Sequence, residues 1–410
     1  MSLKRVVITG RGAVSPFGLG VGLLNDGVWA QRSAVRAMPE WERIRGLHSY
    51  LAAPVPEFDC KSLLPRTLRR TMGPMSVYAA LAAKESVADA GLEEGLLTSG
   101  RVGVAIGSTT GSPTAYEDFY RRFLPEEAIE EIRSGEFFKI MGHTCAANVC
   151  LALGIEGEQW SPVSACTSAS QAMGLAFLLI QTGRQEAMLC GGADEAHPSV
   201  TGVFDVVRAA SCLNDAPTKT PKPFDRDRDG VVCGGGSGIL VLESYDSAKA
   251  RGAKIYAEIL GFGHVNDSTH IANPHESSMA RAMGNALADA GVAGNEIDYV
   301  NAHATGTELG DVAEAKAIGM VVGNKTPVSS FKGHFGHTLG AAGSLETVVL
   351  LEMLERQEVI PTLNLENPDP RCGDVQLARK IDERKLSVVV KNSFALGGVN
   401  VALVMRRIEE

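Results

Sequence analysis

The sequence predicts a layered α/β protein that consists of two similar halves. Short β-branched runs bounded by glycine alternate with alanine- and leucine-rich helical stretches, which is typical of buried strands covered by helices. Several segments recur in the same order along the chain, which indicates an internal duplication. The 410 residues, 45% of them hydrophobic, are enough for two or three folding units that share a large core.

The first recurring pair consists of a helix and the strand that follows it. Residues 86–92 and 286–292 each end an alanine-rich amphipathic helix at a glycine, which is a common helix stop signal. A predicted strand follows each helix, at residues 101–107 in the first half and at residues 297–303 in the second.

The next elements continue in the same order. Residues 162–166 and 327–332 each lead into a helix, and each half finishes with a glycine-containing, hairpin-like segment. We therefore predict a duplicated domain with halves at residues 1–250 and 251–410, packed as one body because no flexible linker separates them. A chance likeness of alanine-rich helices is the alternative. A charged insertion at residues 116–136 is predicted to be a solvated helical excursion.

Composition excludes several classes of partner. With 39 basic and 48 acidic side chains the net charge is −9, and no basic tail or stripe suggests a nucleic-acid partner. The apolar stretches are shorter than the roughly 18–20 residues that cross a bilayer, so no membrane span is predicted. The N-terminus is expected to form a strand rather than a signal peptide, which predicts a cytoplasmic protein. The 8 cysteines form no CxxC pairs, which argues against a disulfide framework or a zinc knuckle.

Two glycine-rich segments are poor candidates for nucleotide binding. Residues 10–15 begin like a dinucleotide fingerprint, but the third glycine is missing and Pro16 stands where a helix would start. Residues 233–238 lack the Gly-Lys-Ser/Thr ending that holds phosphates. A tight backbone turn is the simpler interpretation of this second segment.

Cys166 is the candidate nucleophile. A strand-like approach at residues 161–165 leads to it, and residues 167–180 form an apolar helix. The sulfur would therefore face the unpaired N–H groups and the positive end of a helix, which lower a thiol pKa and favour the thiolate. The same N–H groups could hold an oxyanion. From this local pattern alone, a buried structural cysteine is an equally good interpretation.

Candidate partners for Cys166 lie in the second half. His303 ends a predicted strand and precedes a glycine-containing loop, while Lys332, His334 and His337 lie in a glycine-rich loop just before a helix. Each histidine alone would be interpreted as structural. Because the duplication matches their region to that of Cys166, we expect the groups to converge. A metal site at His334 and His337 is the alternative, but no third ligand lies nearby in the sequence.

These motifs resemble the elongating 3-oxoacyl-[acyl-carrier-protein] synthases, closest to type II, of the thiolase superfamily. The resemblance covers essentially the whole chain, and its specific motifs are residues 165–168, 301–307, Lys332 with residues 336–343, residues 223–225 and residues 228–230. It implies two similar five-stranded mixed sheets that sandwich helices in an αβαβα stack. It also implies a decarboxylating Claisen condensation in fatty acid biosynthesis, which joins an acyl group to a malonyl thioester.

The resemblance assigns roles to individual residues. Cys166 would accept the acyl chain as a thioester, and His303 and His337 would bind the malonyl thioester and stabilise the enolate. Lys332 would lie near both histidines, held by Glu314. Asp311 falls at the other acidic position of the family.

Further roles concern binding. Backbone N–H groups of Cys166 and Leu396 would hold the oxyanion, and Thr305 and Thr307 would bind the pantetheine arm. The acidic acyl carrier protein would dock near basic residues, for which the candidates are Arg69, Arg70 and Arg208. No metal or organic cofactor is implied beyond the phosphopantetheine of the carrier. A homodimer is expected, with a heterodimer as the alternative.

Three departures from the family pattern concern acyl-chain preference. Residues 394–396 read Phe-Ala-Leu where the family usually has two phenylalanines, so the acyl-pocket gate is aliphatic Leu396. Thr110 replaces an apolar residue of the pocket floor, and residues 332–335 depart from the usual small-residue loop. A specialised synthase for aryl-polyene, polyketide or unusual lipid chains, working with a chain-length partner subunit, is therefore an alternative function.

Two further alternatives come from other functional classes. A cysteine hydrolase would use Cys166 with one histidine but has no use for the second histidine and Lys332. A non-catalytic chain-length subunit would usually lack the nucleophile that this chain retains.

Overall fold

The two halves of the chain have the same sheet topology. The structure is a computed structural model that describes residues 3–130 and 132–408. In each half the first three strands of the order are parallel, and the last two run antiparallel to their neighbours. The order in the first half is β6 (Gln159–Trp160), β5 (Val102–Gly107), β7 (Ala187–Asp194), β8 (Gly236–Ser244) and β1 (Val6–Ser15), and in the second half it is β11 (Pro327–Ser329), β10 (Tyr299–Asn301), β15 (Val388–Phe394), β16 (Val399–Arg406) and β9 (Ala257–Asn266).

A short antiparallel pairing joins the two sheets. Val6, Val7 and Ile8 of β1 pair with residues 257–259 of β9. The short strands β13 (Gln376–Leu377) and β2 (Gly18–Leu19) extend this sheet beside β11 and β1. The predicted duplicated fold is confirmed, and the β1–β9 pairing adds a direct link between its sheets. We propose the end of α11 (Tyr245–Ala250) as the boundary between the halves, as predicted.

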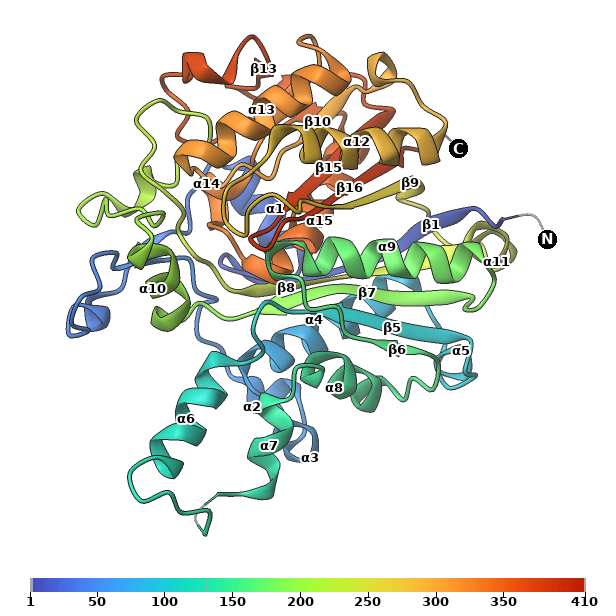
Figure 1. Ribbon diagram of the computed structural model, residues 1–410. Coiled ribbons are helices and arrows are strands. Elements are labelled where there is room, and N and C mark those ends of the chain that lie inside the picture. The colour runs from blue at the N-terminus through green and yellow to red at the C-terminus, as the bar shows by residue number, and fades with distance from the viewer. Residues whose placement is uncertain (1–2, 131, 409–410) are drawn as a thin grey trace.

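Helices form three layers around the two sheets, which gives the expected αβαβα stack (Figure 1). The outer layers contain α4 (Pro74–Ala90) and α8 (Thr144–Leu153) on the first sheet and α12 (Glu276–Ala290) and α13 (Glu308–Val322) on the second. The central layer consists of α9 (Ser168–Gln181) and α15 (Ala342–Arg356). Because both sheets cover these two helices, most of their side chains are buried.

Paired glycines allow the outer helices to approach the sheets closely. A Cβ atom on Gly12 of β1 would lie 2.0 Å from the carbonyl oxygen of Ala82 in α4. A Cβ atom on Gly263 of β9 would lie 2.0 Å from the carbonyl oxygen of Ala282 in α12. The Gly-x-Gly of residues 10–12 is therefore part of a strand that packs on a helix, and the second half repeats the arrangement.

The remaining elements border this core. The charged insertion forms an arm of α6 (Pro113–Phe123) and α7 (Ser134–Ile140) that projects from the body, with Arg122 paired to Glu136 (Figure 1). The other elements are α1 (Val21–Trp29), α2 (Cys60–Leu63), α3 (Arg66–Arg69), α5 (Glu94–Leu97), α10 (Pro198–Val206), α14 (Lys332–Phe335), η1 (Pro39–Trp41), η2 (Ala165–Thr167), η3 (Pro217–Lys219), η4 (Gly294–Glu296), η5 (Leu339–Ala341), η6 (Pro370–Cys372), β3 (Arg36–Ala37) paired with β4 (Leu51–Ala52), and β12 (Glu358–Val359) paired with β14 (Asp382–Glu383).

Within the described residues, no helix has the length and apolar character needed to traverse a lipid bilayer. The cytoplasmic location stays a prediction from the sequence.

The close packing of α12 on β9 can be tested by a pair of substitutions. We expect Gly263→Ala to lower the free energy of unfolding by about 1–3 kcal/mol, because the added methyl group overlaps a helix backbone. Gly284 of the same helix faces open space, so Gly284→Ala should raise stability by about 0.5–1 kcal/mol. Denaturant unfolding measures both values. A Gly263→Ala protein as stable as the wild type would contradict this packing.

Candidate active site

Cys166 lies at the turn that leads into the central helix α9. It is the middle residue of η2, is only 5% exposed, and follows Ala165, whose φ of 49° is unusual for a residue with a side chain. The Ser168 hydroxyl supports the turn, since its oxygen lies 2.7 Å from the carbonyl oxygen of Ala165 and accepts from the N–H of Ser164 at 3.0 Å. The sulfur is therefore held on a fixed turn at the start of a helix, as predicted.

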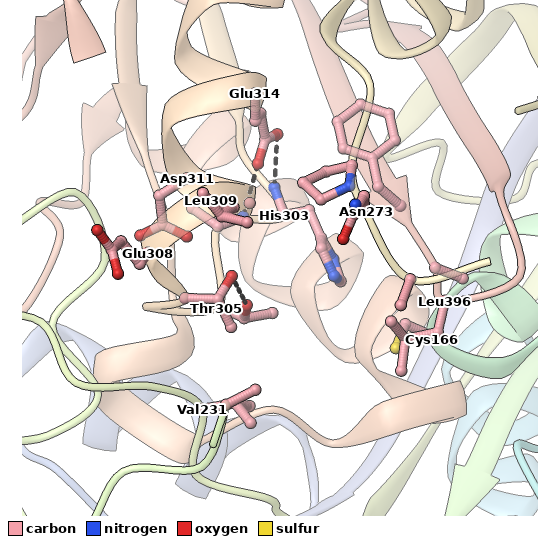
Figure 2. A pocket seen from close by; sticks show the side chains of 18 of the residues that line it. Cys166, Val231, Asn273, His303, Thr305, Glu308, Leu309, Asp311, Glu314 and Leu396 are labelled. Atoms are coloured by element: carbon pink, nitrogen blue, oxygen red, sulfur yellow. Dashed lines mark hydrogen bonds between the residues drawn. The ribbon is translucent and has the colours of Figure 1, made fainter. Parts of the chain in front are cut away.

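Two histidines from the second half meet the sulfur of Cys166. His303 follows β10 and His337 follows α14, and their ring centroids lie 5.1 Å apart with nearly perpendicular planes. The sulfur and one ring nitrogen of each histidine lie within 4.8 Å of one another. Figure 2 shows His303 beside Cys166 and Leu396. The expected convergence of these residues is observed, although their chemical roles remain proposals.

Both imidazoles are neutral at neutral pH. Burial, followed by the nearby Lys332 and Lys391 ammonium groups, lowers the pKa of His337 well below its ordinary value. The same causes, with His337 as a further one, lower the pKa of His303. Nδ1 of His303 and both ring nitrogens of His337 are buried without a hydrogen-bond partner in the described structure. These nitrogens are therefore available to a bound molecule.

Lys332 is held by a buried carboxylate that the sequence did not reveal. Its ammonium pairs with Glu346 of α15 and donates to the carbonyl oxygen of His303 at 2.9 Å. The second carboxylate oxygen of Glu346 lies 2.7 Å from Nζ of Lys391 in β15. All three charged side chains are fully buried. The sequence does not single out Glu346, because α15 also carries Glu352 and Glu355, which are less buried.

Glu314 has a different partner from the one predicted. Its carboxylate accepts from the backbone N–H groups of His303 at 2.8 Å and Ala304 at 2.7 Å, and from the Asn392 side chain at 3.1 Å (Figure 2). The prediction that Glu314 holds Lys332 is therefore wrong, because Glu346 occupies that position. Glu314 instead fixes the backbone of the loop that carries His303.

The resting thiol is more protonated than the local sequence pattern predicted. Burial raises the pKa of Cys166 to about 12 and outweighs the opposing effect of the Lys332 ammonium and of the N–H groups of Cys166 and Leu396. The predicted lowering of this pKa is therefore wrong for the free protein. The two N–H groups still act on the sulfur and lower its pKa, which is the arrangement expected for an oxyanion site.

A cavity of about 470 Å³ leads from Cys166 to the surface and is lined by Thr305 and Thr307, whose hydroxyls lie 3.2 Å apart (Figure 2). Buried Asp311 fixes their loop by accepting from the N–H groups of Gly306 at 3.1 Å and Phe224 at 2.8 Å. Arg228 donates to the carbonyl oxygen of Thr307 at 3.0 Å and lies 3.6 Å from Asp311. The motifs at residues 223–225 and 228–230 thus support the wall of the cavity.

Of the three candidate docking arginines, one lines the cavity. Arg208 is exposed and lines the cavity. Arg69 ends α3 and donates to the carbonyl oxygen of Leu64 at 2.9 Å, and neither it nor Arg70 lines the cavity. A docking role for these three arginines stays a prediction.

The metal interpretation of His334 and His337 is not supported by the geometry. His334 lies 3.2 Å from the carbonyl oxygen of Arg32 and is not part of the cluster around the sulfur. In the described chain, the only group of three potential metal ligands is Cys166, His303 and His337. A divalent cation there would be repelled by the nearby Lys332 and Lys391 ammonium groups.

Comparisons with known proteins agree with this arrangement. The family models "Beta-ketoacyl synthase, N-terminal domain" and "Beta-ketoacyl synthase, C-terminal domain" match residues 3–248 and 256–366. The chain is 37% identical over 417 residues to the 3-oxoacyl-[acyl-carrier-protein] synthase 2 of Vibrio cholerae, covering 99% of this chain and 100% of that relative. The enzyme of the same name from Staphylococcus aureus (strain COL) is 34% identical and is matched over 99% of both chains.

Solved structures give the same result. A beta-ketoacyl synthase from Burkholderia phymatum has a TM-score of 0.96 at 43% identity, covering 99% of this chain and 100% of that one. The ishigamide ketosynthase/chain length factor has a TM-score of 0.91 at 31% identity, with 100% of both chains covered. A type II PKS acyl-carrier protein in complex with its ketosynthase provides a third match, with a TM-score of 0.91 at 30% identity and the same coverage.

Proposed function

The chain belongs to the beta-ketoacyl synthase family, and we propose that Cys166, His303 and His337 carry out a decarboxylating Claisen condensation. An acyl thioester and a malonyl thioester, both on acyl carrier protein, give a 3-oxoacyl thioester, carbon dioxide and free carrier. The observation that carries this proposal is the convergence of one thiol and two neutral imidazoles with unpartnered ring nitrogens in one buried site.

The first half-reaction loads the enzyme. The Cys166 sulfur attacks the acyl thioester carbonyl. Its high pKa leaves the resting thiol protonated, so the proton must be removed, and a neutral imidazole accepts it. The backbone N–H groups of Cys166 and Leu396 hold the oxyanion of the tetrahedral intermediate. The carrier thiol then leaves with a proton, and the acyl group remains on the sulfur.

The second half-reaction forms the new carbon–carbon bond. N–H groups of His303 and His337 donate to the thioester oxygen of the malonyl group, where negative charge appears as the bond to the departing carbon dioxide breaks. The resulting enolate carbon attacks the acyl-Cys166 carbonyl and expels the Cys166 thiolate, which takes a proton from solvent, so the overall reaction consumes one proton. Neutral imidazoles suit this task because each can donate a hydrogen bond without stabilising the malonyl carboxylate as an ion pair.

No cofactor beyond the phosphopantetheine arm of the carrier is part of this proposal. Thr305 and Thr307 would bind that arm, since they line the cavity between the surface and Cys166. The exposed side chain of Leu396 also lines the cavity, so an aliphatic residue takes the gate position. This feature favours the alternative of a specialised synthase for polyketide, aryl-polyene or unusual lipid chains, which differs in the acyl group and not in the chemistry.

For the acyl carrier protein we propose a docking surface at the mouth of the cavity. Arg208 is surrounded there by exposed apolar side chains of residues that also line the cavity, namely Val207, Ile271 and Leu309. The adjoining Val206 is 81% exposed. An acidic carrier would meet Arg208 through charge and the neighbouring residues through apolar contact.

We further propose a homodimer through the free edge of β6. This strand ends the sheet, so its outer backbone groups have no strand partner within the described chain. Beside it lies a hollow lined by Trp160, Leu175, Leu178 and Phe262. A second copy would pair with the edge and cover these apolar groups. A heterodimer remains the alternative, since one similar structure is a ketosynthase with a chain length factor.

The catalytic assignment predicts different outcomes for three histidines. His303→Ala and His337→Ala should each lower malonyl-carrier decarboxylation about 100-fold or more, because each removes a donor to the developing oxyanion. His334→Gln is the control, since His334 lies outside the cluster, and it should stay within about threefold of the wild type at equal folded fraction. Release of labelled carbon dioxide measures all three rates.

The nucleophile is tested separately by mass spectrometry after incubation with an acyl carrier. Cys166→Ala should acquire no covalent acyl group, and an acylated Cys166→Ala protein would refute the assignment. Normal elongation by either His303→Ala or His337→Ala would refute the role of that histidine.

The proposed carrier-docking surface and the proposed dimer interface are tested by a reciprocal pair of variants. Val207→Asp should weaken carrier binding about tenfold or more while the protein stays dimeric. Leu178→Asp should dissociate the dimer without changing the affinity for the carrier. Calorimetry and sedimentation provide the two readouts. Unchanged carrier affinity in Val207→Asp would reject the carrier-docking surface, and a dimeric Leu178→Asp would reject the dimer interface.

A further inference from the structure

The turn that carries Cys166 has a counterpart in the second half. η5 precedes α15 as η2 precedes α9, and each begins with a residue of positive φ, Leu339 at 54° and Ala165 at 49°. Gly340 is the middle residue of η5, as Cys166 is of η2. The second half therefore keeps the nucleophile turn but has a glycine in place of the nucleophile.

A buried carboxylate occupies the N–H site of this second turn. Asp194 ends β7 and is only 1% exposed. Its Oδ2 accepts from the N–H of Gly340 at 2.7 Å and from the N–H of Thr109 at 3.0 Å. A Cβ atom on Gly340 would lie 2.6 Å from Oδ2 and 3.0 Å from Ser108. Only glycine allows this close approach without a shift of the surrounding groups.

These two hydrogen bonds connect the His337 loop to a segment that contacts the Cys166 turn. Gly340 lies three residues after His337 in one connected loop. Thr109 follows Ser108, whose carbonyl oxygen accepts from the Ser168 hydroxyl at 3.0 Å. Ser168 in turn supports the turn of Cys166 through Ser164. Asp194 is thus the shared acceptor of the His337 loop and of the segment at Thr109, which reaches the Cys166 turn through Ser168.

We propose that Asp194 is a positioning residue that fixes the His337 loop against the Cys166 turn. This inference rests on the proposed function for its catalytic consequence. The carboxylate does not line the cavity, so its effect passes through the loops that it joins. Its loss should therefore affect the step that needs His337 more than the step that needs the thiol alone.

The charge of Asp194 has a second effect, on the thiol itself. The carboxylate raises the pKa of Cys166, and the same charge acts on Cys145 of α8 and on Cys233 just before β8. Burial raises the pKa of Asp194 to about 7, with Glu195 adding to the shift. At pH 8 the carboxylate is therefore mostly ionised, and removing its charge should favour the Cys166 thiolate.

The test compares Asp194→Asn and Asp194→Ala with Glu195→Gln. Glu195 is the matched control, because it is also buried but accepts from Ser112, Met75 and Thr114. At pH 8, alkylation of Cys166 by iodoacetamide, followed by mass spectrometry, should be about threefold or more faster in Asp194→Asn than in the wild type. Decarboxylation should fall about tenfold or more relative to acyl loading in both Asp194 variants. Glu195→Gln should change neither the alkylation rate of Cys166 nor the rate of decarboxylation relative to acyl loading.

Equal losses of loading and decarboxylation in both Asp194 variants, or unchanged alkylation in Asp194→Asn, would overturn the proposal. If Asp194→Ala does not fold, Asp194→Asn decides, since it keeps the size of the side chain. If the wild-type protein does not decarboxylate malonyl carrier, the proposed function fails instead, and the alkylation rates still decide whether Asp194 controls the thiol.

Discussion

The buried carboxylate of Glu346, which lies between the ammonium groups of Lys332 and Lys391, is the constraint on which the site depends. Leaving a buried charge without its partner costs about 3–5 kcal/mol, so Glu346 is what allows two ammonium groups to remain inside the protein. Those groups, added to burial, keep His303 and His337 neutral. Lys332 also donates to the carbonyl oxygen of His303, so the same charge fixes the position of the loop.

The duplicated fold explains why these groups meet. The first half supplies Cys166 at the start of α9, and the second half supplies both histidines from loops at the ends of β10 and α14. The central helices α9 and α15 lie between the two sheets, so their N-terminal turns are buried together. One turn carries the nucleophile, while the equivalent turn binds Asp194. The asymmetry lies at the middle residue of each turn, which is Cys166 in the first half and Gly340 in the second.

Sequence patterns predicted the fold and the convergence of Cys166, His303, Lys332 and His337, because strand ends and glycine loops are local features. The partner of Lys332 was missed because Glu346 is one of three glutamates in α15, and the sequence does not show which of them faces Lys332. The thiol pKa was predicted in the wrong direction, since a helix start is visible in the sequence but the extent of desolvation is not. The docking role of Arg69, Arg70 and Arg208 stays a prediction, since a carrier-binding surface depends on the partner as well as on this chain.

The claim that two neutral imidazoles flank the thiol is tested most directly by ¹⁵N NMR of the protein labelled at its 9 histidines. The signals of His303 and His337 are assigned by loss in His303→Gln and His337→Gln. Because burial and two ammonium groups lower both pKa values, we expect both imidazoles to stay neutral across the range in which an exposed histidine titrates, near its ordinary pKa of about 6.5. Protonation of either imidazole between about pH 6 and 7 would contradict this claim.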